Sequence, residues 1–187
     1  MNKISIQYYK FRIGEIILGS FDQKLCLLDF RYRRMRMAVD NRIKNGLNAE
    51  YVERNDSILE NTISQVSEYL DGNRKKFDIP LLMVGTEFQR KVWHALMEVH
   101  YGATSTYLKL ARTINNEKAV RAVAAANGAN SIGLIIPCHR ITGSDGELVG
   151  YGGGLQVKKR LLELEQRESA LTDDEKYNFI GNKDSKI

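Results

Sequence analysis

Residues 132–141 read Ile-Gly-Leu-Ile-Ile-Pro-Cys-His-Arg-Ile and anchor the interpretation of the whole chain. The apolar run up to Ile136 is typical of a buried strand or extended segment. It delivers Cys138 to a fixed place, directly beside His139 and behind a proline. A thiol becomes a strong nucleophile only as the thiolate, and a neighbouring base or cation lowers its pKa. Taken alone, such a pair is more often a buried structural cysteine beside a hydrogen-bonded histidine.

The composition is that of a globular protein. The chain has 187 residues, enough for one large or two small domains, and a hydrophobic fraction of 43%. No apolar run is long enough to span a bilayer, and the N-terminus lacks a secretory pattern. Two cysteines make no disulfide framework, so we expect a reducing, cytoplasmic location. Cys26 lies in an apolar strand-like run and is interpreted as core packing.

The charge gives a weak indication of a partner. A net charge of +5 is compatible with a polyanion, but the basic residues form no single block. The densest cluster consists of Arg31, Arg33, Arg34 and Arg36. Because this cluster follows a strand-like run, we interpret it as a solvated loop.

The N-terminal part alternates strand-like and helical patterns. Residues 4–11 alternate polar and apolar side chains, and residues 13–30 are typical of a hairpin. Residues 57–70 carry apolar side chains at helical spacing. Asp56 or Ser57 is the expected N-cap of this helix.

The remaining segments suggest where domains begin and end. Residues 36–56 are polar and fit no single pattern, whereas residues 73–80 are charged and are expected to link two domains. We therefore expect an N-terminal α/β domain, a mostly helical second domain and a polar C-terminal tail. Their expected boundaries are 1–80, 85–168 and 169–187.

The second domain contains a candidate helix-turn-helix. Thr86 can cap its first helix, and Thr106 opens a shorter helix that ends before a turn at 115–116. Residues 118–126 then form another short helix, rich in alanine, from which Arg121 projects. Many helical domains contain such a pair without binding DNA. The bare helix either packs tightly inside the protein or approaches a nucleic-acid groove.

The last part of the chain combines a glycine loop with a helix. Residues 152–154 are glycines that follow Tyr151, and they either let the backbone pass close to a ligand or form a plain flexible loop. The strand–GxGxxG–helix context of a dinucleotide site is missing. Residues 155–167 are expected to form the final helix, with Glu165 near its end.

Taken together, these residues resemble the methylated-DNA–protein-cysteine methyltransferase family, the O6-alkylguanine-DNA alkyltransferases. Their order and spacing match over residues 85–166, and Ala-Ala-Asn-Gly at 125–128 resembles the bacterial stand-alone form. The resemblance implies an α/β (α+β) protein with a small ribonuclease H-like N-terminal domain before a mostly helical domain with a helix-turn-helix. The matching residues are Tyr107, Arg121, Asn130, Pro137, Cys138, His139, Arg140, Tyr151, Lys158 and Glu165.

The resemblance implies DNA repair by direct reversal. An alkyl group moves from O6 of guanine in double-stranded DNA to the sulfur of Cys138, once per molecule and without a cofactor. O4 of thymine stays open as a second target. His139 takes the thiol proton through a water, and Glu165 orients and charges that imidazole. Tyr107 donates to the purine ring as negative charge develops.

The resemblance also implies a substrate-binding set. The backbone N–H of Gly152 donates to O6, and the carbonyls of Cys138 and Ile141 accept the exocyclic amine. Tyr151 and Lys158 belong to the same set. Asn130 holds the turn beneath the site and ties the recognition helix to the cysteine segment.

For DNA, the resemblance implies a flipped base and a minor-groove helix. Arg121 fills the space that the flipped base leaves in the stack. Ala122, Ala125 and Ala126 let the helix approach the groove without sequence specificity. We expect a monomer that acts on cytoplasmic, nucleoid DNA.

Some features leave alternatives open. Asn127 is polar where some relatives have an apolar pocket wall, so the substrate range is undecided. We predict no metal, since Cys26, His94 and His100 form no convincing ligand set. The alternatives are a non-catalytic alkyltransferase-like lesion-binding protein, which the presence of Cys138 disfavours, a helix-turn-helix regulator and a cysteine hydrolase.

Overall fold

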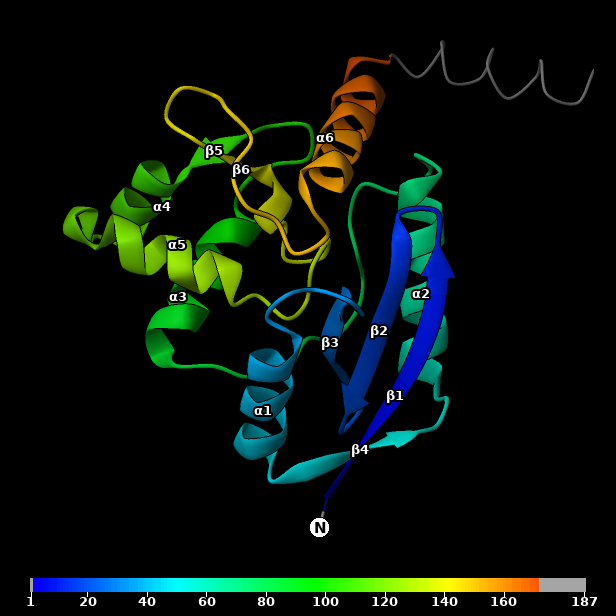
Figure 1. The fold of residues 1–187 in the computed structure, drawn as a ribbon. Coiled ribbons are helices and arrows are strands. Elements are labelled where there is room, and N and C mark those ends of the chain that lie inside the picture. The colour runs from blue at the N-terminus through cyan, green and yellow to red at the C-terminus, as the bar shows by residue number, and fades with distance from the viewer. Residues whose placement is uncertain (1, 172–187) are drawn as a thin grey trace, which may run out of the picture.

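The N-terminal part is built on a four-stranded sheet with the order β3-β2-β1-β4, in a computed structural model that describes residues 2–171 (Figure 1). The first three strands form an antiparallel meander, and β4 pairs in parallel with β1. The predicted hairpin is present, with a tight turn at Asp22 and Gln23. The strands are β1 (Asn2–Phe11), β2 (Gly14–Phe21), β3 (Lys24–Phe30) and β4 (Ala49–Glu53).

The polar segment 36–56 folds into helix α1 (Arg36–Leu47) followed by strand β4. Only Val39 and Ile43 of α1 are buried, so its apolar stripe is too narrow to stand out in the sequence. The helix ends at Asn48, whose φ of 46° reverses the chain into β4. Asparagine tolerates this left-handed conformation better than most residues.

Helix α2 (Ser57–Leu70) has the predicted bounds and packs against β1, β2 and β3. The Asp56 carboxylate accepts hydrogen bonds from the backbone N–H groups of Ile58 and Leu59, which identifies Asp56 as the N-cap. The apolar face of the helix carries Tyr69 into the interior, where its side chain is fully buried.

The second part is mainly helical, and both α3 and α4 pack against α5 (Figure 1). Thr86 and Gln89 form a capping box at the start of α3, and Thr106 caps α4. A 3-10 turn at Glu117–Ala119 precedes α5, so α5 itself begins later than the sequence predicts. The elements are α3 (Glu87–Met97), β5 (Ser105–Thr106), α4 (Tyr107–Thr113), α5 (Val120–Gly128), β6 (Ile141–Thr142) and α6 (Leu155–Ala170).

The final helix is longer than predicted. Because α6 runs to Ala170, the predicted tail does not begin at 169, and Ser169 and Ala170 are helical. Leu171 follows the helix as its C-cap, and residues 172–187 of that tail lie outside the described residues. Within residues 2–171, no helix combines the length and the apolar character needed to cross a membrane.

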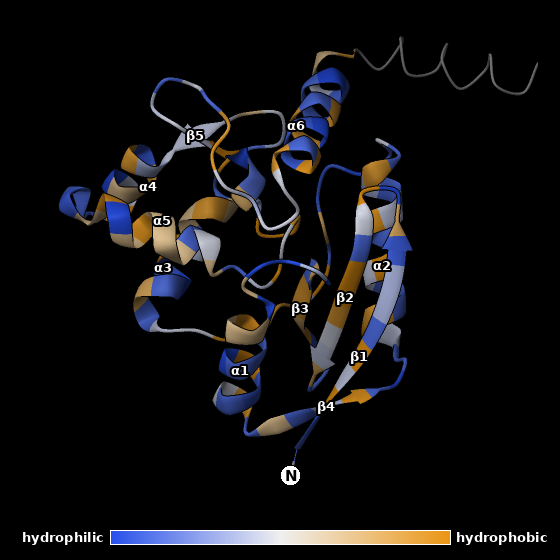
Figure 2. Ribbon diagram, viewed as in Figure 1, coloured by the Kyte–Doolittle hydropathy of each residue, from blue (hydrophilic) through white to orange (hydrophobic). Residues whose placement is uncertain are grey.

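The two parts share one hydrophobic core. Leu28 of β3 and Trp93 of α3 belong to the same buried cluster, and Figure 2 shows hydrophobic residues concentrated in β2 and β3. The predicted linker, residues 73–80, is not a free connection, because the carbonyl of Pro80 accepts a hydrogen bond from the Leu25 N–H at 2.8 Å. The second domain is therefore held along the edge of β3.

Cys26 belongs to a second buried cluster, which confirms its interpretation as core. Its Sγ lies 3.4 Å from the carbonyl oxygen of Gly19, and burial raises the pKa of this thiol to about 12. A buried thiol of this kind is inert as a nucleophile. Among the residues that the structure describes, no three His, Cys, Asp or Glu side chains gather as a metal-ligand set.

Candidate active site

Cys138 lies in a one-turn 3-10 helix, Cys138–Arg140, directly before β6. The preceding residues 132–136 are largely buried, as predicted. Beyond one isolated bridge from Ile132 to Leu28 of β3, the segment is a turn and not the predicted strand or extended run, because the Ile136 N–H donates to the Ile132 carbonyl at 3.0 Å and Leu134 has a φ of 66°. The side chain of Cys138 is nearly buried, which fixes the position of its sulfur.

Asn130 ties this segment to the end of α5. Its Nδ2 donates to the carbonyl of Ile136 at 2.8 Å, and its Oδ1 accepts from the N–H of Ile132 at 3.0 Å. Because Asn130 is buried, both bonds are shielded from water. These contacts are the connection between the recognition helix and the cysteine segment that the sequence predicts.

Glu165 is a fully buried carboxylate at the centre of a hydrogen-bond network. Its Oε1 lies 2.9 Å from Nε2 of His139, and Arg140 donates from Nε to Oε2 at 2.9 Å and from Nη2 to Oε1 at 2.8 Å. The Gly102 N–H donates to Oε2 at 3.1 Å, and the Tyr69 hydroxyl donates to Oε1 at 2.6 Å. Burial raises the pKa of this carboxyl, but the bonds from His139 and Arg140 outweigh burial and hold the pKa at about 2.

The network sets the protonation of the histidine and the cysteine. Burial lowers the pKa of His139, and the opposing effect of Glu165 does not outweigh it. Burial likewise raises the pKa of the Cys138 thiol. The resting site therefore holds a neutral imidazole beside a neutral thiol. Glu165 favours the charged imidazole, as the sequence predicts, but burial is the larger effect on the pKa of His139.

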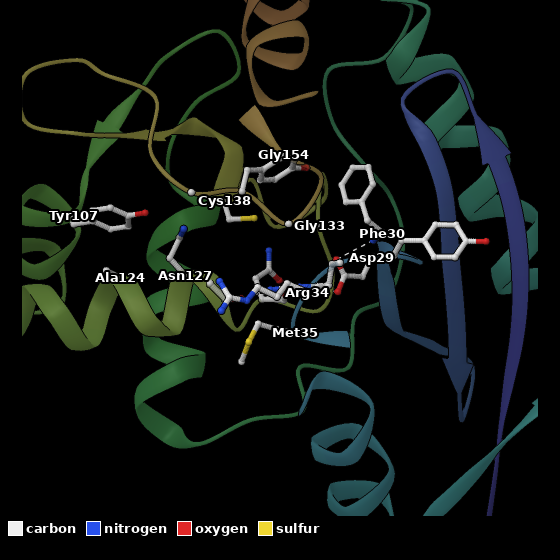
Figure 3. Close-up of a pocket in the computed structure, with 17 residues that line it drawn as sticks. Asp29, Phe30, Arg34, Met35, Tyr107, Ala124, Asn127, Gly133, Cys138 and Gly154 are labelled. Carbon is white, nitrogen blue, oxygen red and sulfur yellow. Dashed lines mark hydrogen bonds and ion pairs between the residues drawn. The ribbon is translucent and has the colours of Figure 1, made fainter. Parts of the chain in front are cut away.

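A cavity of about 450 Å³ contains Cys138 in its wall (Figure 3). This volume lies within the range of small-ligand sites, about 300–1,000 Å³. The cavity brings together residues from α4, from the end of α5 and from the glycine loop. Four further residues of the predicted site line it, namely Tyr107, Asn130, Tyr151 and Gly152.

Other predicted site residues support the cavity from behind. His139 and Glu165 are fully buried and are not part of its lining. Lys158 is also fully buried, and its Nζ donates to the carbonyl of Ile141 and to the carbonyl of Val149, the latter at 2.6 Å. Burial lowers the pKa of Lys158 to about 8. Lys158 and Ile141 therefore fix the loop that carries the lining residues and do not line the cavity themselves.

Helix α5 presents two different faces. Arg121, Ala122 and Ala125 are exposed, as a DNA-facing surface requires. Ala126 is buried, and its carbonyl accepts from Nε1 of Trp93 at 2.9 Å. The prediction that Ala126 contacts DNA is therefore wrong, because the helical repeat turns this position toward the core.

The interpretation of the arginine cluster after β3 as a solvated loop is wrong for Arg33 and Arg36, although Arg34 is exposed. Arg33 donates to Asp29 at 2.7 Å and to the Asn130 carbonyl at 2.9 Å, and it also bonds the Gly128 carbonyl. Arg36 donates to the same Asp29 at 2.9 Å. Because a buried carboxylate needs cationic partners, Asp29 draws both arginines inward. Arg33 thereby joins the N-terminal domain to the end of α5.

Sequence reasoning missed Tyr69, which reaches the Glu165 network from the N-terminal domain. Its position on the apolar face of α2 predicts burial, and a buried tyrosine hydroxyl usually has a hydrogen-bond partner. Nothing in the sequence pattern says which partner that is. The contact depends on how α2 meets the second domain.

These features together define a class of protein. A thiol lies in the wall of a cavity, with a histidine and a buried carboxylate behind it. The pocket adjoins a helix-turn-helix whose second helix has an exposed, alanine-rich face with one arginine. Such an arrangement is that of a cysteine-based transferase acting on a nucleic-acid base.

Comparison with known families gives the same answer. A family described as "6-O-methylguanine DNA methyltransferase, DNA binding domain" matches residues 87–167, and its "ribonuclease-like domain" matches residues 4–83. The chain belongs to this 6-O-methylguanine DNA methyltransferase family. The predicted family, the fold class and the activity, methyl transfer from DNA to a protein cysteine, are confirmed.

Individual relatives cover nearly the whole chain. The methylated-DNA–protein-cysteine methyltransferase of Methanosarcina barkeri is 40% identical over 154 residues, which are 82% of this chain and 92% of that protein. The Haemophilus influenzae protein of the same name is 37% identical over 168 residues, which are 89% of this chain and 88% of that protein. Mycobacterium tuberculosis OGT in complex with DNA superposes with a TM-score of 0.72 at 32% identity, covering 89% of this chain and 94% of that one.

Proposed function

We propose that this protein repairs DNA by moving one alkyl group from O6 of guanine to the sulfur of Cys138, irreversibly and once per molecule. One observation carries the assignment of the nucleophile. Of the two cysteines, Cys138 lines the cavity, whereas Cys26 is sealed in the core of the other domain. Double-stranded DNA is the substrate, and the repair takes place on nucleoid DNA in the cytoplasm.

The histidine is arranged to act as a base. Its Nε2 faces the Glu165 carboxylate, so Nε2 carries the proton and Nδ1 keeps its lone pair. Nδ1 has no hydrogen-bond partner within residues 2–171. In the proposed mechanism, Nδ1 takes the Cys138 proton through a water molecule as the sulfur attacks. A neutral histidine suits this role because only the unprotonated nitrogen can accept a proton.

The transfer step is a displacement at carbon. The S–C bond to Cys138 forms as the C–O6 bond breaks, and the electron pair of that bond passes to the guanine. Tyr107 donates to the purine ring, and the N–H of Gly152 donates to O6, so the guanine leaves without a full negative charge. The proton lost by the thiol balances the proton that the guanine gains.

DNA reaches the site through α5. A base inside the duplex is inaccessible to a buried thiol in a cavity wall, so the nucleotide must flip out of the stack. Exposed Arg121 fills the vacated space, while Ala122 and Ala125 let the helix approach the minor groove. Asn130 connects the end of this helix to the cysteine segment, which couples DNA binding to the site.

Mass spectrometry of the intact protein tests the proposal. Incubated with an excess of duplex containing O6-methylguanine, the protein gains the mass of one methyl group, on Cys138, and then stops. Cys138→Ala binds the duplex but gains nothing, whereas Cys26→Ala reacts like the wild type. Turnover beyond one equivalent, or methyl on Cys26, contradicts the proposal, and lesion binding without any mass gain identifies a non-catalytic lesion-binding protein.

A further inference from the structure

Asn127 is a buried polar residue in the wall of the cavity. It lies in the last turn of α5, its side chain is 5% exposed, and it lines the cavity together with Tyr107 and Cys138. Figure 3 shows its side-chain amide pointing into the space between those two residues. The mechanism described above gives Asn127 no role.

The amide oxygen of Asn127 is unsatisfied. Its Oδ1 has no hydrogen-bond partner among the described residues. Buried side-chain polar atoms nearly always have a partner, so an unpaired one in a cavity wall indicates a ligand group that completes it. The amide nitrogen has a different neighbour: burial and Cys138 raise the pKa of Tyr107, and a hydrogen bond from Asn127 to its oxygen partly opposes that rise.

An acceptor at this point distinguishes the two lesions that the sequence leaves open. An O6-alkylated guanine has one N–H donor group on its rings, the exocyclic amine N2, because N1 loses its proton on alkylation. An O4-alkylated thymine has no N–H group at all. A guanine can therefore satisfy an unpaired acceptor in the pocket, whereas a thymine leaves it unpaired, and such mismatches discriminate strongly.

The position of N2 fits the neighbours of Asn127. N2 is bonded to the purine ring to which Tyr107 donates in the proposed mechanism. Tyr107 and Asn127 line the same cavity and would thus contact the same base. The amine has two hydrogens. The Cys138 carbonyl accepts one, and because the Ile141 carbonyl already accepts from Lys158, Asn127 is the acceptor for the other.

We propose that Asn127 is a specificity-determining residue whose Oδ1 accepts a hydrogen bond from the N2 amine, so that the protein prefers O6-alkylguanine to O4-alkylthymine. This inference rests on the proposed function. It assigns Asn127 to substrate selection and leaves proton transfer to His139.

The test combines one variant with one altered base. Wild type and Asn127→Leu, which has a similar volume and no acceptor, react with duplexes that contain O6-methylguanine or O6-methylhypoxanthine, the same base without N2. A lost hydrogen bond corresponds to a rate loss of ~10-fold. Wild type is expected to react at least ~10-fold more slowly with the hypoxanthine duplex, and this penalty is expected to shrink by ~10-fold in Asn127→Leu, which reacts more slowly than wild type with the guanine duplex.

Two further comparisons strengthen the test. With O4-methylthymine, Asn127→Leu is expected to react at least as fast as the wild type, so the guanine preference shrinks. Asn45→Leu makes the same substitution on exposed α1, outside the cavity, and keeps the wild-type preference. If Asn127→Leu does not fold, Asn127→Asp retains an acceptor and is expected to keep the preference for guanine over hypoxanthine.

The outcomes separate this inference from the proposed function. A hypoxanthine penalty of the same size in wild type and Asn127→Leu overturns the role of Asn127, and so does loss of the preference in Asn127→Asp. In either case the proposed transfer of a methyl group to Cys138 still stands. A wild-type protein that gains no methyl group from any of these duplexes overturns the proposed function itself.

Discussion

The two domains differ in how directly their sequences show what they do. In the second domain, Cys138, His139 and Arg140 are consecutive, and the residues that support them follow in a recognisable order. The N-terminal domain carries no comparable motif, yet it places Tyr69 against Glu165 and Arg33 against the end of α5. A reactive group can be local in the sequence while the groups that hold it are distributed over the chain.

Arg33 offers the largest test of this difference. Arg33→Ala leaves the buried Asp29 with Arg36 as its remaining cationic partner, and removing one member of a buried pair typically costs ~3–5 kcal/mol of stability. We expect the unfolding free energy to fall by an amount near the lower end of this range. We also expect slower transfer, because Arg33 holds the carbonyls at the end of α5. Urea unfolding and a transfer assay measure the two effects.

Arg12→Ala is the matched control for that experiment, since Arg12 forms an exposed ion pair with Asp71 in the same domain. Exposed pairs contribute less than ~1 kcal/mol. If Arg33→Ala and Arg12→Ala lose equal amounts of unfolding free energy and of transfer rate, the contacts of Arg33 have no specific role in supporting the site.

The corresponding test in the second domain is a substitution of Glu165. Glu165→Gln removes the charge that orients His139, and we expect transfer to slow by at least ~10-fold, since a positioned base contributes ~10²–10⁴-fold. The same variant changes acid stability. A carboxyl whose pKa is lower in the folded chain stabilises the fold above its unfolded pKa, ~4.3, and this stabilisation is lost as the pH falls toward about 2.

Unfolding free energies measured between pH 6 and pH 3 check this prediction for Glu165. Wild type is expected to lose stability over this range more steeply than Glu165→Gln. Parallel curves, or transfer at the full rate in the variant, would remove Glu165 from both roles.

Tyr69 gives the smallest expected effect and the finest comparison. Tyr69→Phe keeps the ring packed against the core but removes one of the hydrogen bonds to Glu165, and hydrogen bonds to charged groups contribute ~1.5–3 kcal/mol. Because the other donors to Glu165 remain, we expect the loss of unfolding free energy to lie at the lower end of this range and the transfer to be several-fold slower. Thermal melting and single-turnover kinetics measure both, and unchanged kinetics would restrict Tyr69 to packing.

The sequence predicted more of the second domain than of the first. Side chains that cap helices, such as Asp56, Thr86 and Thr106, act on the backbone within three residues, so their roles are visible in local patterns. Helix α1 and strand β4 escaped prediction because few of their side chains are buried. The arginine cluster was misread because its buried partner, Asp29, looks like any strand-end carboxylate in the sequence.

What the sequence by itself determined is the chemistry: a cysteine beside a histidine, an arginine on a bare helix, and a spacing that identifies the family. Only the tertiary structure decided the electrostatic state of that chemistry, because burial, and with it the pKa of Cys138, His139 and Glu165, depends on every element packed around them. It also decided which alanines of α5 face outward and that Asn127 keeps a free acceptor in the pocket. Those properties arise from contacts between residues far apart in the chain, which local spacing does not encode.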